Sequence, residues 1–301
     1  INSLASKQLL HPENIKYINN IAIELNLEYE KYIHLKIKDN LNKRWEVPKN
    51  DILNQEYLNK LYNNQQEINS NNVMNKDSFS IKASVKDNNF SLQLNNKNSN
   101  EEEFFSFTTS NNFLYSDTFI NFEFLLSSND IYGFGERTHD FKLSDGIYTT
   151  WSLDSKGTRY DDGLGGMNQY SHQPIGLHKT KYDNLWLGFV FLNTNAQDLV
   201  INSKNNSPKT SMMHKTIGGI VDYYIIIDKD PEKITRDIQF LLGPPTLPPY
   251  WSVGFHQCRY GYHNFDEFKD VYENYKKYQI PIDTMWIDID SYIKFELFTV
   301  N

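Results

Sequence analysis

Two carboxylates follow an apolar run near the last residue of this 301-residue chain. The stretch covers residues 282–290, and the two carboxylates at its end are Asp288 and Asp290. The run predicts a buried strand, and in α/β barrels the ends of such strands carry the active site. Carboxylates placed there accept charge-assisted hydrogen bonds, which are stronger than neutral ones. We therefore expect this stretch to open a catalytic domain whose remainder lies outside the 301 residues.

The elements before these carboxylates predict one βαβ unit of a parallel sheet or barrel. Residues 251–255 are predicted to form a short apolar strand. Asn264, with Glu267 three residues later, is typical of a capped helix start, and Pro281 ends the helix. Helical spacing of apolar residues supports it at Phe265, Phe268, Val271, Tyr272 and Tyr275.

The rest of the chain predicts many short strands, which favours a β-sandwich. The first 30 residues (1–30) are charged and weakly periodic, so an irregular segment is expected there, with a short helix as the alternative near residues 14–22. A sandwich domain is predicted over residues 31–243, and the Pro-rich stretch from residue 243 predicts an extended connector into a second domain over residues 244–301. The strands are predicted at residues 32–38, 79–85, 90–94, 119–126, 185–192 and 221–227.

Composition excludes several classes of protein. The formal net charge is −8, and no Lys/Arg cluster is present, which argues against a nucleic-acid partner. No apolar stretch is long enough for a transmembrane helix. Cys258 is the one cysteine, so no intrachain disulfide is expected. No His/Cys/Asp cluster has the spacing of metal ligands, and no cofactor is predicted.

Five motifs in order resemble glycoside hydrolase family 31, the α-glucosidase group that includes maltase-glucoamylase and sucrase-isomaltase. They lie at residues 42–48 (Asn-Lys-Arg-Trp-Glu-Val-Pro), 131–137 (Ile-Tyr-Gly-Phe-Gly-Glu-Arg), 216–224, 243–256 and 286–290 (Trp-Ile-Asp-Ile-Asp). The resemblance implies an α+β multidomain fold. A galactose mutarotase-like antiparallel β-sandwich is followed by the first βαβ unit of a truncated (β/α)8 barrel.

The same resemblance implies a retaining, exo-acting α-glucosidase that releases glucose from α-glucans or maltooligosaccharides. The family's nucleophile lies in a Trp-x-Asp-Met-Asn-Glu segment that is absent from these residues, and so is its acid/base aspartate. No catalytic residue is therefore expected in this fragment, which should be inactive alone. Two alternatives stay open: a non-catalytic carbohydrate-contacting module from a partial gene or pseudogene, and glycan trimming of the glucosidase II type. The family implies secretion, a lysosome or the endoplasmic-reticulum lumen, without choosing among them.

The resemblance also implies which residues bind the substrate, an α-glucoside or oligosaccharide. Asp288 is expected to accept hydrogen bonds from the sugar in the −1 subsite, whereas its structural alternative is a helix cap or loop-fixing aspartate. Tyr260 is expected to line the same subsite, and Ile289 to contact the sugar weakly. A loop over residues 151–170 is expected to contribute a further sugar-binding aspartate, either Asp154 or Asp161. Asp290, by contrast, is expected to be structural.

Overall fold

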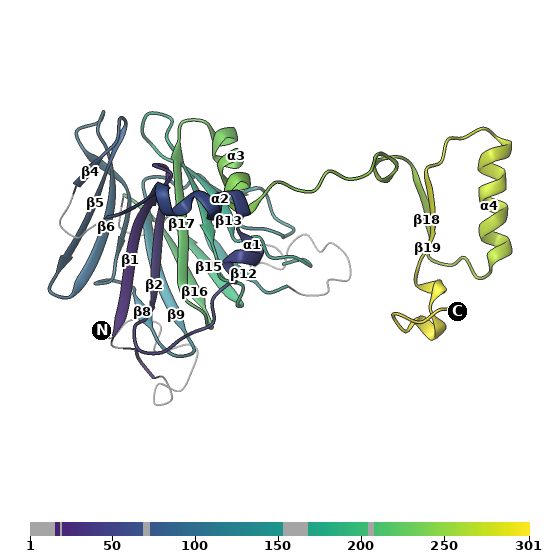
Figure 1. Cartoon of the computed structure of the whole chain (residues 1–301), viewed down its shortest axis with the longest axis horizontal. Helices are drawn as coiled ribbons and strands as arrows, with labels where there is room; N and C mark the ends of the chain where they lie inside the picture. Colours follow the sequence, from purple (N-terminus) through teal and green to yellow (C-terminus); the bar gives the residue numbers. More distant parts are fainter. Residues whose placement is uncertain (1–15, 19, 69–72, 153–167, 204–207) are drawn as a thin grey trace. The chain divides into compact units, whose positions relative to one another are not determined.

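The computed structural model describes residues 16–18, 20–68, 73–152, 168–203 and 208–301 of the chain (Figure 1). Its contacts divide it into two compact units, Ile1–Gly243 and Pro244–Asn301. The first unit is built from two antiparallel β-sheets, and the second contains two short parallel strands and a helix.

Neighbouring strands run antiparallel in both sheets of the first unit. In the eight-stranded sheet, β17 is the last strand along the chain, yet it pairs with both β14 and β2 in the middle of the sheet. In sheet order its strands are β11 (Lys142–Leu143), β10 (Ile131–Gly133), β13 (Ile175–Lys179), β14 (Trp186–Phe191), β17 (Val221–Asp228), β2 (Tyr32–Asp39), β1 (Ile21–Glu28) and β3 (Gln65–Glu67).

The second sheet has nine strands in the described part of the chain. β8 (Leu114–Tyr115) pairs with β9 beside the main path. Along that path the strands are β12 (Gly146–Thr150), β15 (Gln197–Asn202), β16 (Thr210–Thr216), β9 (Ile120–Leu126), β7 (Glu102–Thr108), β6 (Asn89–Asn96), β5 (Phe79–Lys86) and β4 (Val73–Asn75).

An aromatic core joins the two sheets. Phe124 of β9 meets Tyr223 of β17 with ring centroids 4.9 Å apart, and Phe105 of β7 lies 6.3 Å from Phe189 of β14. All four side chains are fully buried. Each such ring buries a large apolar area, so the chain's many phenylalanines and tyrosines can fill the space between the two sheets.

The expectation of an irregular segment over residues 1–30 is wrong for its last third. Residues 21–28 form β1, which pairs with β2 along its whole length from Ile21 opposite Asp39 to Glu28 opposite Tyr32. The alternation that predicts β2 needs a partner strand, and β1 supplies it through Leu25 and Leu27, which are buried. Residues 1–15 lie outside the described part.

Helices cover the outer face of the eight-stranded sheet. α1 (Lys49–Ile52), α2 (Gln55–Leu61), a 3₁₀ turn η3 (Tyr62–Asn64) and α3 (Pro231–Leu242) belong to this layer, and Figure 1 shows α2 and α3 beside β17 and β13. Ile234 and Leu241 of α3 are buried in one cluster with Tyr57 of α2 and Val190 of β14. This second core explains why β14 and β17 are apolar on both faces.

A glycine lets α3 approach β14, and its replacement is expected to destabilise the first unit. A Cβ atom at Gly188 would lie 2.3 Å from Cγ2 of Ile234. We expect Gly188→Ala to lower the free energy of unfolding by about 1–3 kcal/mol, because the helix must shift. Urea-induced unfolding of the 301-residue chain measures the loss.

The matched control is Gly146→Ala on β12. Its Cβ would lie 3.7 Å from the Tyr148 ring, an ordinary contact, so its stability should stay within about 0.5 kcal/mol of the parent. Equal stability of the two variants would show that α3 does not depend on the space at Gly188.

A buried charged network crosses the centre of the eight-stranded sheet. The His34 ring on β2 has Nδ1 2.8 Å from Oε1 of Glu28 and Nε2 2.6 Å from Oδ1 of Asp222. Tyr57 donates a hydrogen bond to the other oxygen of Glu28, and Nζ of Lys49 lies 3.6 Å from Oδ2 of Asp222. Strands β1, β2 and β17 and helices α1 and α2 are thus joined by polar side chains.

The pKa shifts of two members of this network, His34 and Asp222, both favour the charged form. Burial by itself lowers the pKa of His34, but the hydrogen bonds with Asp222 and Glu28 outweigh burial, and the pKa is raised. Burial raises the pKa of Asp222, but the hydrogen bond from His34 and the charges of His34 and Lys49 outweigh it, and the pKa is lowered. Tyr224 stacks on the His34 ring with centroids 4.1 Å apart.

The second unit has the predicted order of strand, helix and strand, but its first strand lies at other residues than predicted. Its elements are η4 (Tyr250–Val253), β18 (His256–Arg259), α4 (Phe265–Lys277), β19 (Thr284–Ile287), η5 (Ile289–Ser291) and η6 (Ile293–Phe295). The predicted strand at residues 251–255 is wrong. The Ser252 amide donates to the Pro249 carbonyl at 3.0 Å and the Gly254 amide donates to the Trp251 carbonyl at 3.2 Å, so a 3₁₀ turn forms there instead.

The predicted helix is confirmed as α4, but the last strand is less buried than expected. Asn264 caps α4 by accepting a hydrogen bond from the Glu267 amide at 2.9 Å, and Glu267 accepts one from the His263 amide at 3.1 Å. β19 has no fully buried residue, because within the described chain it pairs with β18 alone.

Candidate functional site

The parallel pairing of β18 and β19 brings the ends of both strands to one edge. Gln257 pairs with Met285, and Arg259 pairs with Ile287 at the last position of the register. The next residues, Tyr260 and Asp288, therefore follow neighbouring strand ends on the same side of the pair. The family resemblance implies that both line one sugar subsite, and the register is compatible with that grouping.

Helix α4 is joined to this pair of strands by a series of side-chain hydrogen bonds. Tyr275 of α4 donates a hydrogen bond to Oε1 of Gln257 at 2.6 Å, and Nε2 of Gln257 donates to the Tyr262 hydroxyl at 3.1 Å. At the opposite end of the strands, Asp283 accepts a hydrogen bond from the Phe255 amide at 2.9 Å. These bonds hold α4 and both strands together although the unit has few buried side chains.

A carboxylate joins the two loops that follow the strands. Oδ2 of Asp290 accepts a hydrogen bond from the Gly261 amide at 2.8 Å. Gly261 has φ +110°, a conformation that side chains rarely adopt. Asp290 thus has the structural contact that the sequence favoured, and it ties the loop of Tyr260 to the segment of Asp288. Gly261 was not singled out in the sequence, where a lone glycine after a strand is a weak signal.

Asp288 lies just past the end of β19 and starts the turn η5. Its Oδ1 accepts a hydrogen bond from the Ile289 amide at 2.7 Å, whereas Oδ2 accepts none from the described residues. Asp288 is therefore a cap, as in its structural alternative, with one carboxylate oxygen left for a ligand. Ile289 is half-buried in the same turn.

Tyr260 is the aromatic partner in this arrangement. The residue is 63% exposed, and its ring meets Phe295 edge-on with centroids 6.3 Å apart. An exposed aromatic face near a carboxylate can cover the apolar face of a sugar ring while the carboxylate accepts from hydroxyl groups. The structure thus offers one stacking surface and one acceptor at the same strand edge.

The remaining predicted site residues, Asp154 and Asp161, lie outside the described residues. The described residues on either side of that segment are linked by Asn168. Its Oδ1 accepts a hydrogen bond from the Trp151 amide at 2.6 Å, and its Nδ2 donates to the Glu136 carbonyl at 3.1 Å. The two ends of the segment therefore start from a common anchor in the first unit.

The motif at residues 42–48 connects distant segments of the first unit through hydrogen bonds. The Arg44 guanidinium donates to the carbonyls of Gly219, Ser116 and Asp117 at 2.8, 2.7 and 2.9 Å. It thereby connects three chain segments that are far apart in sequence. These contacts give motif 42–48 a physical role that does not require a ligand.

Within the described ranges, no group of three or more His, Cys, Asp or Glu side chains is placed to hold a metal ion. No helix among the described residues is long and apolar enough to cross a membrane.

Comparison with known proteins relates both units to one family. Residues 245–301 match the family description "Glycosyl hydrolases family 31 TIM-barrel domain". Intestinal sucrase-isomaltase of Oryctolagus cuniculus is 30% identical over 285 residues, which cover 94% of this chain and 14% of that protein. The probable alpha/beta-glucosidase agdC of Aspergillus clavatus is 32% identical over 224 residues, which cover 73% of this chain and 24% of that protein.

Solved structures agree at the level of the fold. The glucosidase II alpha subunit, in a crystal structure with alpha3-Glc2 bound, superposes with a TM-score of 0.75 at 14% identity. The superposition covers 95% of this chain and 38% of that subunit. The chain thus spans a minor part of the relatives it matches. The sequence motifs, the strand arrangement and these matches agree, and the chain belongs to glycoside hydrolase family 31.

Proposed function

We propose that this chain contributes to a retaining, exo-acting α-glucosidase that releases glucose from α-glucans or maltooligosaccharides. The observation that carries the proposal is the parallel β18–α4–β19 unit, which places Asp288 and Tyr260 at one strand edge within the segment that matches the family's barrel. The relatives with significant sequence identity are named as sucrase-isomaltase and alpha/beta-glucosidase. Their names support an α-glucoside as the substrate.

In this proposal residues 244–301 form the opening βαβ unit of a (β/α)8 barrel, and the first unit is a galactose mutarotase-like sandwich. Barrel enzymes carry their active sites at the carboxyl ends of the strands, where Tyr260 and Asp288 stand. Oδ2 of Asp288 accepts from a hydroxyl of the sugar in the −1 subsite, and the Tyr260 ring covers the sugar. Ile289 adds an apolar contact, and Asp154 or Asp161 adds a second acceptor.

The reaction itself needs groups beyond these residues. Retaining glycosidases use two carboxyl groups roughly 5–5.5 Å apart, one as nucleophile and one as acid and then base. The 301 residues contain no Trp-x-Asp-Met-Asn-Glu segment to supply the nucleophile. Asp288 therefore serves binding and charge stabilisation, because the oxocarbenium-like transition state gains from a fixed negative charge nearby.

The test compares the 301 residues alone with the same residues joined to the remaining β/α units of a family 31 barrel, which complete the barrel that residues 244–301 open. We expect the pure 301-residue chain to release no glucose from maltose or p-nitrophenyl α-glucoside, and the joined protein to release glucose with retained anomeric configuration. Glucose oxidase assay and NMR of the first-formed anomer measure these results. Turnover by the 301 residues alone, or inversion by the joined protein, would contradict the proposal.

A further inference from the structure

Two histidines are enclosed in the core of the first unit, one on each sheet. His178 of β13 is 0% exposed and His214 of β16 is 1% exposed. Each has one ring nitrogen without a hydrogen-bond partner among the described residues, Nε2 of His178 and Nδ1 of His214. A neutral imidazole can keep a lone pair at that nitrogen, whereas an imidazolium must place a charged N–H there. The surroundings therefore fit the neutral form of both rings.

Aromatic rings surround His214. Its ring stacks on Phe122 with centroids 5.0 Å apart, and its Nε2 lies 3.3 Å from the Tyr223 hydroxyl. Burial raises the pKa of Tyr223 well above its usual value, so this hydroxyl stays neutral. Burial, with the charge of His172 as the second cause, lowers the pKa of His214 to about 3. The other rings in contact with it are apolar: Phe124 of β9, Phe134 after β10 and Phe191 of β14.

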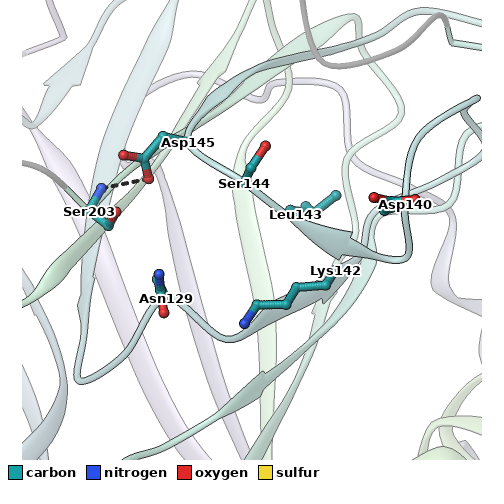
Figure 2. A pocket seen from close by; sticks show the side chains of 7 residues that line it. All are labelled: Asn129, Asp140, Lys142, Leu143, Ser144, Asp145 and Ser203. Carbon is teal, nitrogen blue, oxygen red and sulfur yellow. Dashed lines mark hydrogen bonds between the residues drawn. The ribbon is translucent and has the colours of Figure 1, made fainter. Parts of the chain in front are cut away.

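His178 lies between apolar neighbours, with one charged residue close to it. Ile131 of β10 and Leu187 of β14 flank it in the register, and both are fully buried. Its Nδ1 lies 3.2 Å from the Asp130 carbonyl, to which an N–H at that position donates. The Asp130 carboxylate pairs with Lys142 of β11, whose side chain lines the open hollow in Figure 2. Burial outweighs the contacts with Asp130 and lowers the pKa of His178 to about 4.

A third histidine, His172, has a partner that requires a lone pair on its ring. Nε2 of His172 lies 3.1 Å from Nε2 of Gln197, and the same amide nitrogen donates to the Asn193 carbonyl at 3.4 Å. An amide nitrogen only donates, so the ring nitrogen accepts and carries no proton. Burial, together with the charge of Arg137, lowers the pKa of His172 to about 4.

We propose that His172, His178 and His214 make the first unit sensitive to acid, so that its two sheets stay packed near neutral pH and unfold in a mildly acidic medium. In the unfolded chain each ring binds a proton below about pH 6.5, whereas the folded chain binds it only below about pH 4. The stability that the neutral rings contribute is therefore complete above about pH 6.5 and is lost as the pH falls toward 4.

Other groups with shifted pKa values do not cancel this effect. His34 has a raised pKa, so it acts in the opposite direction and offsets about one of the three rings. Asp183 and Asp228 have lowered pKa values, and the stability that they contribute is complete above about pH 3.9. The window between about pH 4 and 6.5 therefore reports on the histidines. An enzyme built on this unit works in near-neutral surroundings, and an acidic lysosome does not suit it.

The test is the equilibrium constant for urea-induced unfolding of the 301-residue chain, measured at about pH 7.5 and about pH 5 from the β-sheet signal in circular dichroism. Over this range each neutral ring should raise the constant roughly 30-fold, and His34 should lower it by at most a similar factor. The net expectation for the parent is a rise of roughly 10³-fold. A rise of less than about tenfold is incompatible with the proposal.

His214→Phe and His178→Asn remove the two fully buried imidazoles. Phenylalanine matches the rings around position 214, and the asparagine amide can still donate to the Asp130 carbonyl. Each substitution should reduce the ratio between the two constants roughly 30-fold, whatever it does to stability at neutral pH. The matched control is His139→Asn, which removes a half-exposed histidine of the same unit and should keep the parent's ratio.

NMR of the parent chain covers the case in which a variant does not fold. In the folded chain the ring C–H signals of His178 and His214 should not titrate between about pH 7.5 and about pH 5. Titration of these rings near pH 6.5, or a parent-like ratio in both variants, would overturn the proposal. Glucose release enters none of these readouts, so a failed pH test leaves the proposed function standing, and a failed turnover test leaves the acid sensitivity standing.

Discussion

Asp288→Asn is expected to lower kcat/KM for maltose by roughly 10²- to 10³-fold in a protein that joins these 301 residues to the remaining β/α units of a family 31 barrel. The carboxylate offers two charged acceptors, of which Oδ1 binds the Ile289 amide and Oδ2 has no donor among the described residues of this chain. Asparagine replaces one acceptor by a donor and removes the negative charge. The transition state should lose more than the bound substrate, so the fall should appear mainly in kcat.

The substitution separates the binding role of Asp288 from its capping role. Asparagine caps a turn as well as aspartate does, so η5 should keep its structure. The matched control is Asp266→Asn on the first turn of α4, an exposed position that loses the same charge, and its kcat/KM should stay near the parent value. If Asp288→Asn retains full activity, the residue is a cap and does not bind the sugar.

Asp222→Asn is expected to destabilise the first unit by about 3–5 kcal/mol, because it leaves the charged His34 ring without one of its two buried carboxylate partners. Urea-induced unfolding of the 301-residue chain near pH 6 measures the loss. Glu24→Gln is the comparison on the same sheet, since it breaks a half-exposed ion pair with Lys38 and should remove at most about 1 kcal/mol. Similar losses for the two variants would show that the His34 network carries no special stability.

The same network predicts how stability depends on pH. The raised pKa of His34 contributes stability that is complete below its unfolded value of about 6.5 and is lost as the pH rises through the folded pKa. The lowered pKa of Asp222 contributes stability that is complete above about 3.9 and is lost as the pH falls through the folded pKa. The two contributions together are largest between about pH 4 and 6.5, and Asp222→Asn should flatten this profile.

Helices and turns whose backbone is determined by neighbouring residues could be predicted from the sequence. The hairpin of β5 and β6 is one example, because Asp87 and Asn88 both adopt positive φ in its two-residue turn. Helix α4 is another, since its cap and its apolar spacing are both local. In each case a few neighbouring residues determine the backbone, and no distant partner is needed.

Elements that depend on distant partners could not be predicted. β18 is a polar strand whose residues do not alternate between apolar and polar, so its position follows only from its pairing with β19. The strand was predicted over residues 282–290, but it ends at Ile287, and the chain turns into η5 before Asp290. His34 lies in a strand that the sequence predicts, but nothing local to it indicates that Asp222, 188 positions later, binds its ring inside the protein.

The position of β17 has a consequence for synthesis of the chain on the ribosome. Until Val221–Asp228 has left the exit tunnel, the strands β3-β1-β2 and the strands β11-β10-β13-β14 have no bond to one another. Each nascent group then presents an unpaired edge, at β2 and at β14, of the kind that recruits other chains. The edges at β2 and β14 therefore stay open until a strand made near the end of the first unit unites the two groups.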